Sequence, residues 1–292
     1  MHLMMILMAL GIAWFLRLGW SNPVTETDWA GSCMSKRWNR ALLLFLLPSL
    51  LLIVTGLAVL CMGPQGQMVG LSVGWCGYWL ALAFCGFAGV RCFQLGWQGW
   101  HSLQQVRTYP LFTLGEQAGR VLDTPMPFAA LVGFWQPELV ISQGLLKALT
   151  PTHLEAVIIH EKAHYYYRDT FWFFCLGWVR SCTAWLPNTE AIWQELLGLR
   201  ELRADRWAAQ QVDPLVLAES LLIVVSATSS MPTTICAAFS ELTQRNRLEE
   251  RIEVLLTESS SVPHQLDWWD WAWLLLALLP LAAIPFHFGQ SV

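Results

Sequence analysis

Two histidines and a glutamate in one short segment of this sequence have the spacing of a metal site. The segment His160-Glu161-Lys162-Ala163-His164 has the pattern H-E-x-x-H. Residues four apart on an α-helix are separated by about 40° around its axis, so both imidazoles face one point and can bind one Zn²⁺. Glu161 lies next to that point, where its carboxylate can hold a water molecule and accept its proton. The pattern predicts a zinc centre with Glu161 as general base.

The residues before the motif predict the helix that this spacing requires. Thr150-Pro151 is typical of a helix start, because a threonine cap is followed by proline in the first turn. Thr152, supported by Glu155, is an alternative cap. We therefore expect a helix from Pro151 through Tyr167.

This helix is expected to be buried, because position 154 and positions 156–159 are apolar. Burial would leave His160 and His164 desolvated unless a metal or ordinary hydrogen bonds satisfy them. The alternative to a zinc site is a pair of hydrogen-bonded histidines. Lys162 lies about 200° around the helix from His160 and is expected to point away from the metal.

A peptidase zinc site needs a third protein ligand and one open position for water. Glu201 is the candidate third ligand, and Glu195 is its rival. Asp205 lies four residues after Glu201 and shares its helix face. Its carboxylate is expected to hold the outer nitrogen of a ligand histidine and to raise the basicity of that ring. The alternative interpretation of this segment is a surface pair of acids among neighbouring arginines.

The chain around these residues predicts a small α+β domain. Phe128 to Ser142 looks like two short strands that meet at a turn near Gln136-Pro137. Further helices are predicted over Thr189 to Val212, from Asp213-Pro214 through Val225, and over Glu241 to Leu256. The last of these carries opposite charges three and four residues apart, which favours a solvated surface helix.

The composition of the 292 residues points to a membrane protein, since 55% are hydrophobic and only 13% are charged. A helix needs roughly 20 apolar residues to cross a bilayer. The expected spans are Ala41 to Met62 and Leu71 to Val90, both without charge, a shorter one at Leu3 to Phe15, and Trp271 to Phe288. For the short first span we expect Arg17 to snorkel to the interface, and a cleaved signal peptide is the alternative. Trp268 and Trp269 suit an interfacial aromatic belt.

The basic residues predict the orientation of these spans. The loop between the first two spans carries Lys36, Arg37 and Arg40, whereas residues 63–70 carry no lysine or arginine. The positive-inside rule therefore places the first loop, and the region from about residue 91 onward, in the cytoplasm. The net charge of −4 without a basic run excludes nucleic-acid binding. The eight cysteines form no C-x-x-C pair and are interpreted as apolar filling.

The motifs together resemble those of the gluzincin membrane metallopeptidases of the BlaR/MecR antibiotic-sensor type, with the HtpX and CAAX-prenyl-protease group as more distant relatives. The likeness runs from about Pro125 to Leu256. It rests on Pro137-Glu138-Leu139-Val140-Ile141-Ser142, the H-E-x-x-H helix, Arg168-Asp169, Trp185-Leu186-Pro187-Asn188, Trp193 and Glu201-x-x-x-Asp205. The resemblance implies that Glu201 is the third zinc ligand. It also implies that a substrate lies as an added strand along the edge of the strand pair.

Two features depart from that family. The sensor members carry a large extracellular penicillin-binding domain after their last span, whereas this sequence ends at Val292, so we expect no β-lactam sensing by that route. Lys162 stands where the family usually has an apolar residue. Because it is expected to face away from the metal, we expect the chemistry to be intact.

The segment from 171 to 187 raises a question of topology, because Glu201 must reach the same metal as His160. A single complete crossing would carry Glu201 to the opposite side of the membrane. The segment is short and contains Arg180, so we predict a re-entrant or interfacial helix that covers the site. An ordinary buried helix of the cytoplasmic domain is the alternative. A true crossing would require zinc at membrane depth.

These inferences predict a mainly α integral membrane protein, in which transmembrane helices accompany a gluzincin-like α+β zinc peptidase domain with a short β-hairpin. The expected domains are a region of about three spans over 1–95, the zinc metallopeptidase domain over 96–265 and a transmembrane helix over 266–292.

The expected function is that of a zinc metalloendopeptidase with one Zn²⁺ per chain. We expect it in a bacterial inner (cytoplasmic) membrane, with its active site toward the cytoplasm and a membrane or cytoplasmic polypeptide as substrate. The alternative is a regulatory signal-transducing membrane protein that acts on a cytoplasmic repressor or on itself. A transporter is disfavoured, because the spans at 41–62 and 71–90 contain no charged residue.

Overall fold

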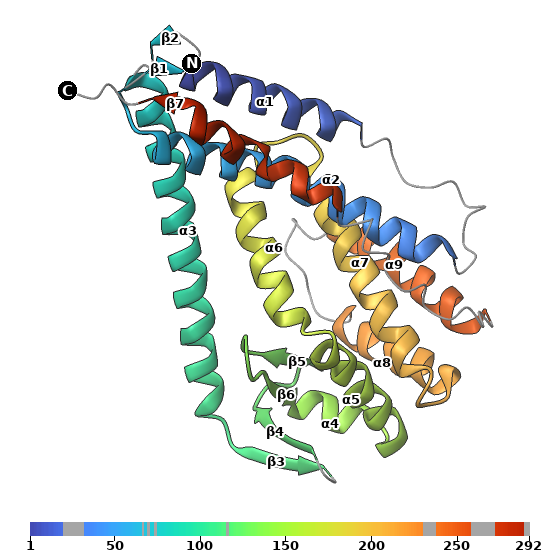
Figure 1. Cartoon of the computed structure of the whole chain (residues 1–292). Coiled ribbons are helices and arrows are strands. Elements are labelled where there is room, and N and C mark those ends of the chain that lie inside the picture. The colour runs from blue at the N-terminus through green and yellow to red at the C-terminus, as the bar shows by residue number, and fades with distance from the viewer. Residues whose placement is uncertain are drawn as a thin grey trace. The chain divides into compact units, whose positions relative to one another are not determined.

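The computed structural model describes residues 1–19, 32–65, 67–68, 71–72, 75–114, 117–229, 238–257 and 272–288. The chain forms two compact units (Figure 1). The first, called the helical unit, comprises 1–95, 175–196 and 261–292, and the second, called the motif unit, comprises 96–174 and 197–260. The H-E-x-x-H segment and residue 201 both belong to the motif unit. Helices α3, α6 and α7 each contribute residues to both units.

The helical unit contains α1 (His2–Leu18), α2 (Ser32–Met62), most of α3 (Trp75–Arg107), the second half of α6 (Asp169–Thr183), the start of α7 (Thr189–Ala208) and the 3₁₀ helix η2 (Trp273–Phe286). Three two-residue strands, β1 (Gln67–Met68), β2 (Leu71–Ser72) and β7 (His287–Phe288), form a small sheet of order β2-β1-β7. Helix η2 packs along α2 (Figure 1). Its Ala283 and Ile284 contact the cluster of Ala58, Val59 and Met62.

Two described helices, over Met34–Met62 and Trp75–Arg107, are long and apolar enough to cross a membrane by length and composition. The predicted helix at Ala41 to Met62 is confirmed as part of α2. The second begins at Trp75 rather than at Leu71, because Leu71–Ser72 pairs as a strand with Gln67–Met68. Helices α1 and η2 are shorter apolar helices. Trp268 and Trp269 lie outside the described residues.

Arg17 does not extend to an interface as expected, and that prediction is wrong. Its side chain is completely buried and donates hydrogen bonds to the Phe45 carbonyl and to Ser49 Oγ, both at 3.2 Å. The guanidinium also lies 5.3 Å from the centre of the Phe45 ring. Ser49 in turn lies within hydrogen-bond distance, 3.1 Å, of Thr183 Oγ1. A buried cation requires polar partners, and the Phe45 carbonyl and the Ser49 hydroxyl of α2 supply them.

Helix α6 covers most of the segment predicted at 171–187, but it begins at Asp169 and ends at Thr183. Fifteen residues rise about 22 Å, which is less than the roughly 30 Å apolar core of a bilayer. Trp178 Nε1 donates to the Ala88 carbonyl of α3 at 2.8 Å, so the second half of α6 packs within the helical unit. Its place relative to a membrane stays a prediction.

The motif unit contains a four-stranded sheet of order β3-β4-β6-β5. Its strands are β3 (Leu111–Leu114), β4 (Gln117–Leu122), β5 (Ala129–Val132) and β6 (Glu138–Ser142). The predicted strand pair is confirmed, because β5 and β6 pair antiparallel with Ala129 opposite Ile141. Strand β4 runs parallel to β6 on the other side, a pairing that the sequence did not reveal. Strand β5 is therefore an edge of the sheet.

Helices α4 (Gln143–Ala148), α5 (Pro151–Tyr166), α8 (Pro214–Ser229) and α9 (Ala238–Leu256) complete the motif unit together with the end of α7. Leu139 and Ile141 of β6 share a buried cluster with Leu154, Val157 and Ile158 of α5. This packing fixes the helix that carries the motif against the sheet.

The predicted caps explain where these helices begin. The Thr150 side chain accepts a hydrogen bond from the His153 amide, and Pro151 occupies the first turn of α5, so Thr150 rather than Thr152 is the cap. Asp213 accepts from the Leu215 amide at 2.9 Å at the start of α8. Such caps satisfy amides that have no partner within the helix.

Candidate metal centre

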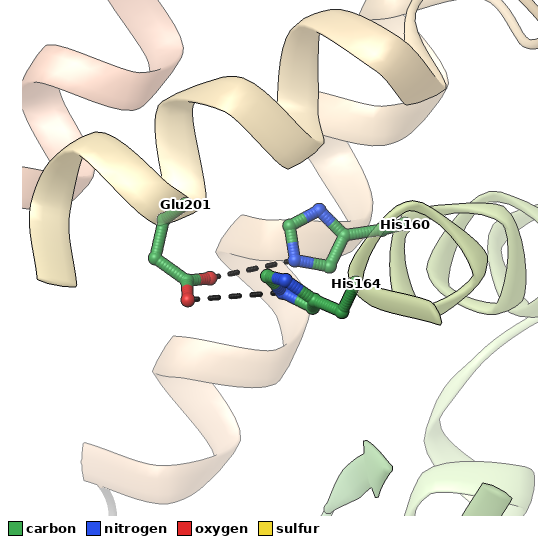
Figure 2. Close-up of side chains that lie close together, drawn as sticks. All are labelled: His160, His164 and Glu201. Atoms are coloured by element: carbon green, nitrogen blue, oxygen red, sulfur yellow. Dashed lines mark ion pairs between the residues drawn. The ribbon is translucent and has the colours of Figure 1, made fainter. Parts of the chain in front are cut away.

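His160 and His164 lie on the buried face of α5, and Glu201 of α7 points its carboxylate at both rings (Figure 2). Glu201 Oε2 is 3.4 Å from His160 Nε2, and Glu201 Oε1 is 3.7 Å from His164 Nε2. The three side chains offer ligand atoms that all lie within 4.8 Å of one another, the arrangement of a candidate metal site. The structure thus brings together the three residues that the sequence predicted as ligands.

The donor set and its spacing fit zinc. A tetrahedral zinc ion with ligands at about 2.0–2.1 Å separates neighbouring ligand atoms by about 3.4 Å, close to the two distances from Glu201 to the histidines. Two imidazoles and one carboxylate form a set that leaves a fourth position open. Burial acts to raise the pKa of Glu201, but the contact with His160 and the positive charges of Arg251 and Arg200 outweigh it and hold the pKa well below its usual range. Its carboxylate is therefore ionised, as a ligand must be.

Asp205 holds the outer nitrogen of His160, as the helix spacing predicted. Asp205 Oδ1 lies 2.9 Å from His160 Nδ1, and Asp205 is completely buried. Burial opposes protonation of the ring, but the carboxylates of Asp205 and Glu201 outweigh it and raise the pKa of His160 to about 9. This contact directs Nε2 toward Glu201 and makes the ring a stronger electron donor.

Asp169 plays the same part for His164. His164 Nδ1 is 2.7 Å from Asp169 Oδ2, and Asp169 is buried. Arg203 of α7 donates to the other oxygen of Asp169 and lies over the Tyr167 ring at 4.2 Å. In the sequence this aspartate entered only as part of the family resemblance, without a role. Arg168 between α5 and α6 has φ 53°, and this left-handed residue turns the chain back toward the motif.

Arg251 of α9 is the second residue of the centre that the sequence did not indicate. It donates to both oxygens of Asp205 at 2.6 and 2.8 Å, and its Nη1 lies 3.6 Å from Glu201 Oε2. The prediction that α9 is an entirely solvated surface helix is therefore wrong at this position. Burial lowers the pKa of Arg251, but Asp205 and Glu201 outweigh that effect and raise it, so the guanidinium remains charged. A buried acid such as Asp205 requires a cation, and this requirement was the only signal for Arg251.

Glu161 is half-buried beside the two histidines and belongs to the same turn of α5. Burial raises its pKa, and the charges of the two histidines act in the opposite direction. Lys162 is exposed, as its angle on the helix predicted. Glu195, the rival ligand, instead pairs with Arg37 at 2.7 Å.

A helix that presents two histidines and a glutamate, together with a third ligand, a carboxylate, on a neighbouring helix, defines a zinc metallopeptidase of the H-E-x-x-H type. A small sheet with β5 as an outer strand accompanies this centre. Residues 117–225 match the sequence model of Peptidase family M48, so this part of the chain is an M48 peptidase domain. That range includes the sheet from β4 onward, both histidines, Glu201 and Asp205. No curated protein matches the chain, and no solved structure does.

Proposed function

We propose that this chain is a membrane-embedded zinc endopeptidase in which His160, His164 and Glu201 hold the metal and Glu161 acts as general base. The single observation that carries this proposal is the convergence of the two Nε2 atoms on the Glu201 carboxylate within an M48 peptidase domain. The two long apolar helices support a location in a membrane.

The residues of the centre would divide the work of peptide hydrolysis among them. Zinc in this site would supply a Lewis acid that polarises the peptide carbonyl and lowers the pKa of a water molecule. Glu161 accepts a proton from the water while the water oxygen bonds to the carbonyl carbon. Glu161 then delivers that proton to the amide nitrogen as the C–N bond breaks, which leaves an amine and a carboxylic acid, and the acid ionises in water. Its raised pKa suits a group that both accepts and returns a proton.

Strand β5 supplies the surface on which an extended substrate would lie. It is one of the two outer strands of the sheet, and among the described residues only β6 pairs with it, along one edge. An added strand pairs through main-chain hydrogen bonds, which hold a polypeptide without requiring a particular sequence. Helix α5 packs against β5 (Figure 1), so such a strand would run close to the motif helix.

We propose, more specifically, that this chain is a relative of the BlaR/MecR type and lies in a bacterial cytoplasmic membrane. The support for this assignment is the order of motifs along the sequence, together with Lys36, Arg37 and Arg40 before the apolar part of α2, which favour a cytoplasmic face for the site. On that assignment the substrate is a cytoplasmic repressor or a membrane protein. Protease protection of tags in right-side-out vesicles would test the orientation.

The test of the catalytic proposal compares two substitutions on the same turn of α5. Glu161→Gln should retain zinc, measured by elemental analysis of the purified full chain, but should lose cleavage of casein or of the chain itself. Lys162→Gln should retain both, because Lys162 is exposed and faces away from the centre. Unimpaired proteolysis by Glu161→Gln would overturn the assignment.

A further inference from the structure

Hydrolysis at this centre would place negative charge on the carbonyl oxygen of the substrate, so the site needs a group that stabilises that charge. Described side chains that could do so include three consecutive tyrosines of α5 and its cap, Tyr165, Tyr166 and Tyr167, and the arginines that contact the centre, Arg200, Arg203 and Arg251. Their contacts show which of these side chains already bind another group and which have donors left for a substrate.

Each of the three tyrosines is either exposed or in contact with another side chain. Tyr165 and Tyr166 are exposed, and the Tyr166 ring stacks on Trp207 at 5.7 Å. Tyr167 lies against the guanidinium of Arg203, 4.2 Å from ring centre to cation. Burial is the largest of the effects that raise the pKa of Tyr167, so its hydroxyl stays neutral.

Two of the arginines are committed to buried aspartates. Arg251 donates two hydrogen bonds to Asp205, which it must neutralise. Arg203 is paired with Asp169 in the same way. Moving either guanidinium toward a substrate would leave a buried carboxylate without its counter-ion.

Arg200 differs from both in its partner, which is the candidate ligand Glu201 rather than a buried aspartate. Among the described residues its Nε and Nη2 atoms donate to one oxygen, Glu201 Oε1, at 3.0 and 2.7 Å, and 30% of its side chain is exposed. The guanidinium also lies 4.9 Å from the centre of the Phe173 ring, which fixes its plane. Its partner Glu201 lies 3.4 and 3.7 Å from the Nε2 atoms of His160 and His164, so Arg200 stands beside the metal centre.

The geometry points to Arg200 as the residue that stabilises the oxyanion of the tetrahedral intermediate. A guanidinium presents five N–H donors in a fixed plane, and Glu201 accepts from one at Nε and one at Nη2, which leaves three that no other described residue uses. Because Arg200 is held by Glu201 beside the two histidines, a substrate carbonyl at the open position of the metal would approach these remaining donors. This inference rests on the proposed peptidase function and names a further residue for it.

The experiment uses the zinc-loaded full chain in detergent, with Arg200→Lys, Arg200→Ala and, as control, Arg206→Gln on the same helix. We expect Arg200→Ala to lower kcat by on the order of 100- to 1000-fold with little change in KM. Arg200→Lys should be partly active. Added guanidinium at millimolar concentration should restore part of the activity of Arg200→Ala only.

A second readout does not depend on turnover. A phosphinic peptide, whose tetrahedral anionic phosphorus group imitates the intermediate, should bind Arg200→Ala more weakly by a factor similar to the loss in kcat/KM. Arg206→Gln should bind it as the wild-type chain does. Zinc content is measured for every variant.

Three outcomes are distinguishable. Wild-type chain that is loaded with zinc but inactive contradicts the peptidase function itself. Active Arg200→Ala with unchanged phosphinate affinity overturns the role of Arg200. Loss of zinc from Arg200→Ala, with activity recovered at saturating zinc, also overturns it, because Arg200 would then serve only to position Glu201.

Discussion

Arg251 of α9 donates to both carboxylate oxygens of Asp205 of α7, 46 positions earlier in the chain, at 2.6 and 2.8 Å. Asp205 in turn holds His160, so the three residues form a chain of contacts that ends at a metal ligand. Arg203, Asp169 and His164 form a second chain of the same composition. Each histidine is thus held by an aspartate, and each aspartate by an arginine.

Replacing Arg251 with methionine should destabilise the motif unit strongly. Asp205 is completely buried, and breaking a buried ion pair from one side costs about 3–5 kcal/mol. The measurement is denaturant unfolding of the metal-free chain in detergent, followed by circular dichroism. Arg247→Gln on the same helix is the control and should unfold near the wild-type midpoint. Equal midpoints for both variants would show that the Arg251–Asp205 pair contributes no stability.

Asp169→Asn should weaken zinc binding without removing a ligand. The amide cannot hold the His164 ring as an ionised carboxylate does, and loss of such a partner typically lowers metal affinity about 10- to 100-fold. Competition with a chelator of known affinity measures the change. Asp213→Asn is the matched control, because asparagine caps a helix as well as aspartate does. If both variants bind zinc equally, Asp169 has no part in the centre.

Glu201→Gln and Glu195→Gln should separate the two candidate ligands. Loss of Glu201 removes a ligand, so zinc affinity should fall by more than the factor of about 10 to 100 that loss of an outer partner causes. Glu195 pairs with Arg37, so its substitution should leave zinc affinity unchanged. The same chelator competition decides, and zinc loss from Glu195→Gln would reverse the assignment.

Zinc affinity should rise with pH up to about 9. Although burial favours the neutral ring, Asp205 and Glu201 raise the pKa of His160 to about 9 in the metal-free chain, and zinc must displace that proton. Below pH 9 the apparent affinity should therefore fall up to tenfold per pH unit from this group alone. Calorimetry in buffers of different ionisation enthalpy should detect a released proton at pH 7.5. No proton release at that pH would contradict the raised value.

The stability of the metal-free chain should change with pH in the opposite direction. The folded-state pKa of His160, about 9, is above the ordinary value of 6.5. Its contribution to folding is therefore fully present below pH 6.5 and is lost as the pH rises through about 9. Unfolding midpoints at pH 6 and pH 9.5, with and without Asp205→Asn, measure this contribution. The difference between the two pH values should shrink in the variant.

Gly133→Ala should disturb the edge strand without affecting the metal. Gly133 follows β5 with φ 125°, and an added Cβ would lie 3.2 Å from Pro137 Cα. The strain is about 1–3 kcal/mol and falls on the turn that positions β5. We expect a lower kcat/KM for a polypeptide substrate at unchanged zinc content. Gly86→Ala is the control, because its Cβ would meet nothing within 4 Å.

The ligands were predictable because their signals are local. Four-residue spacing on a helix places His160 beside His164 and Glu201 beside Asp205 whatever the rest of the fold does. The cap at Thr150 and the strand pair around Gln136-Pro137 depend equally on neighbouring residues, and both were predicted. The convergence of the two helices on one point was implied by the motifs, and the structure supplied its distances.

The residues that surround the ligands came from the folded chain alone. Arg251 lies on a segment whose alternating charges match a solvated helix, and nothing in that pattern marks one arginine as buried. Asp169 becomes a partner of His164 across the turn between α5 and α6, where Arg168 is left-handed. Charge pairs between distant positions form where packing brings buried acids and bases together, and a periodicity along the sequence carries no information about that packing. The motif spacing therefore defined the chemistry, and the fold selected the arginines and the aspartate that hold it in place.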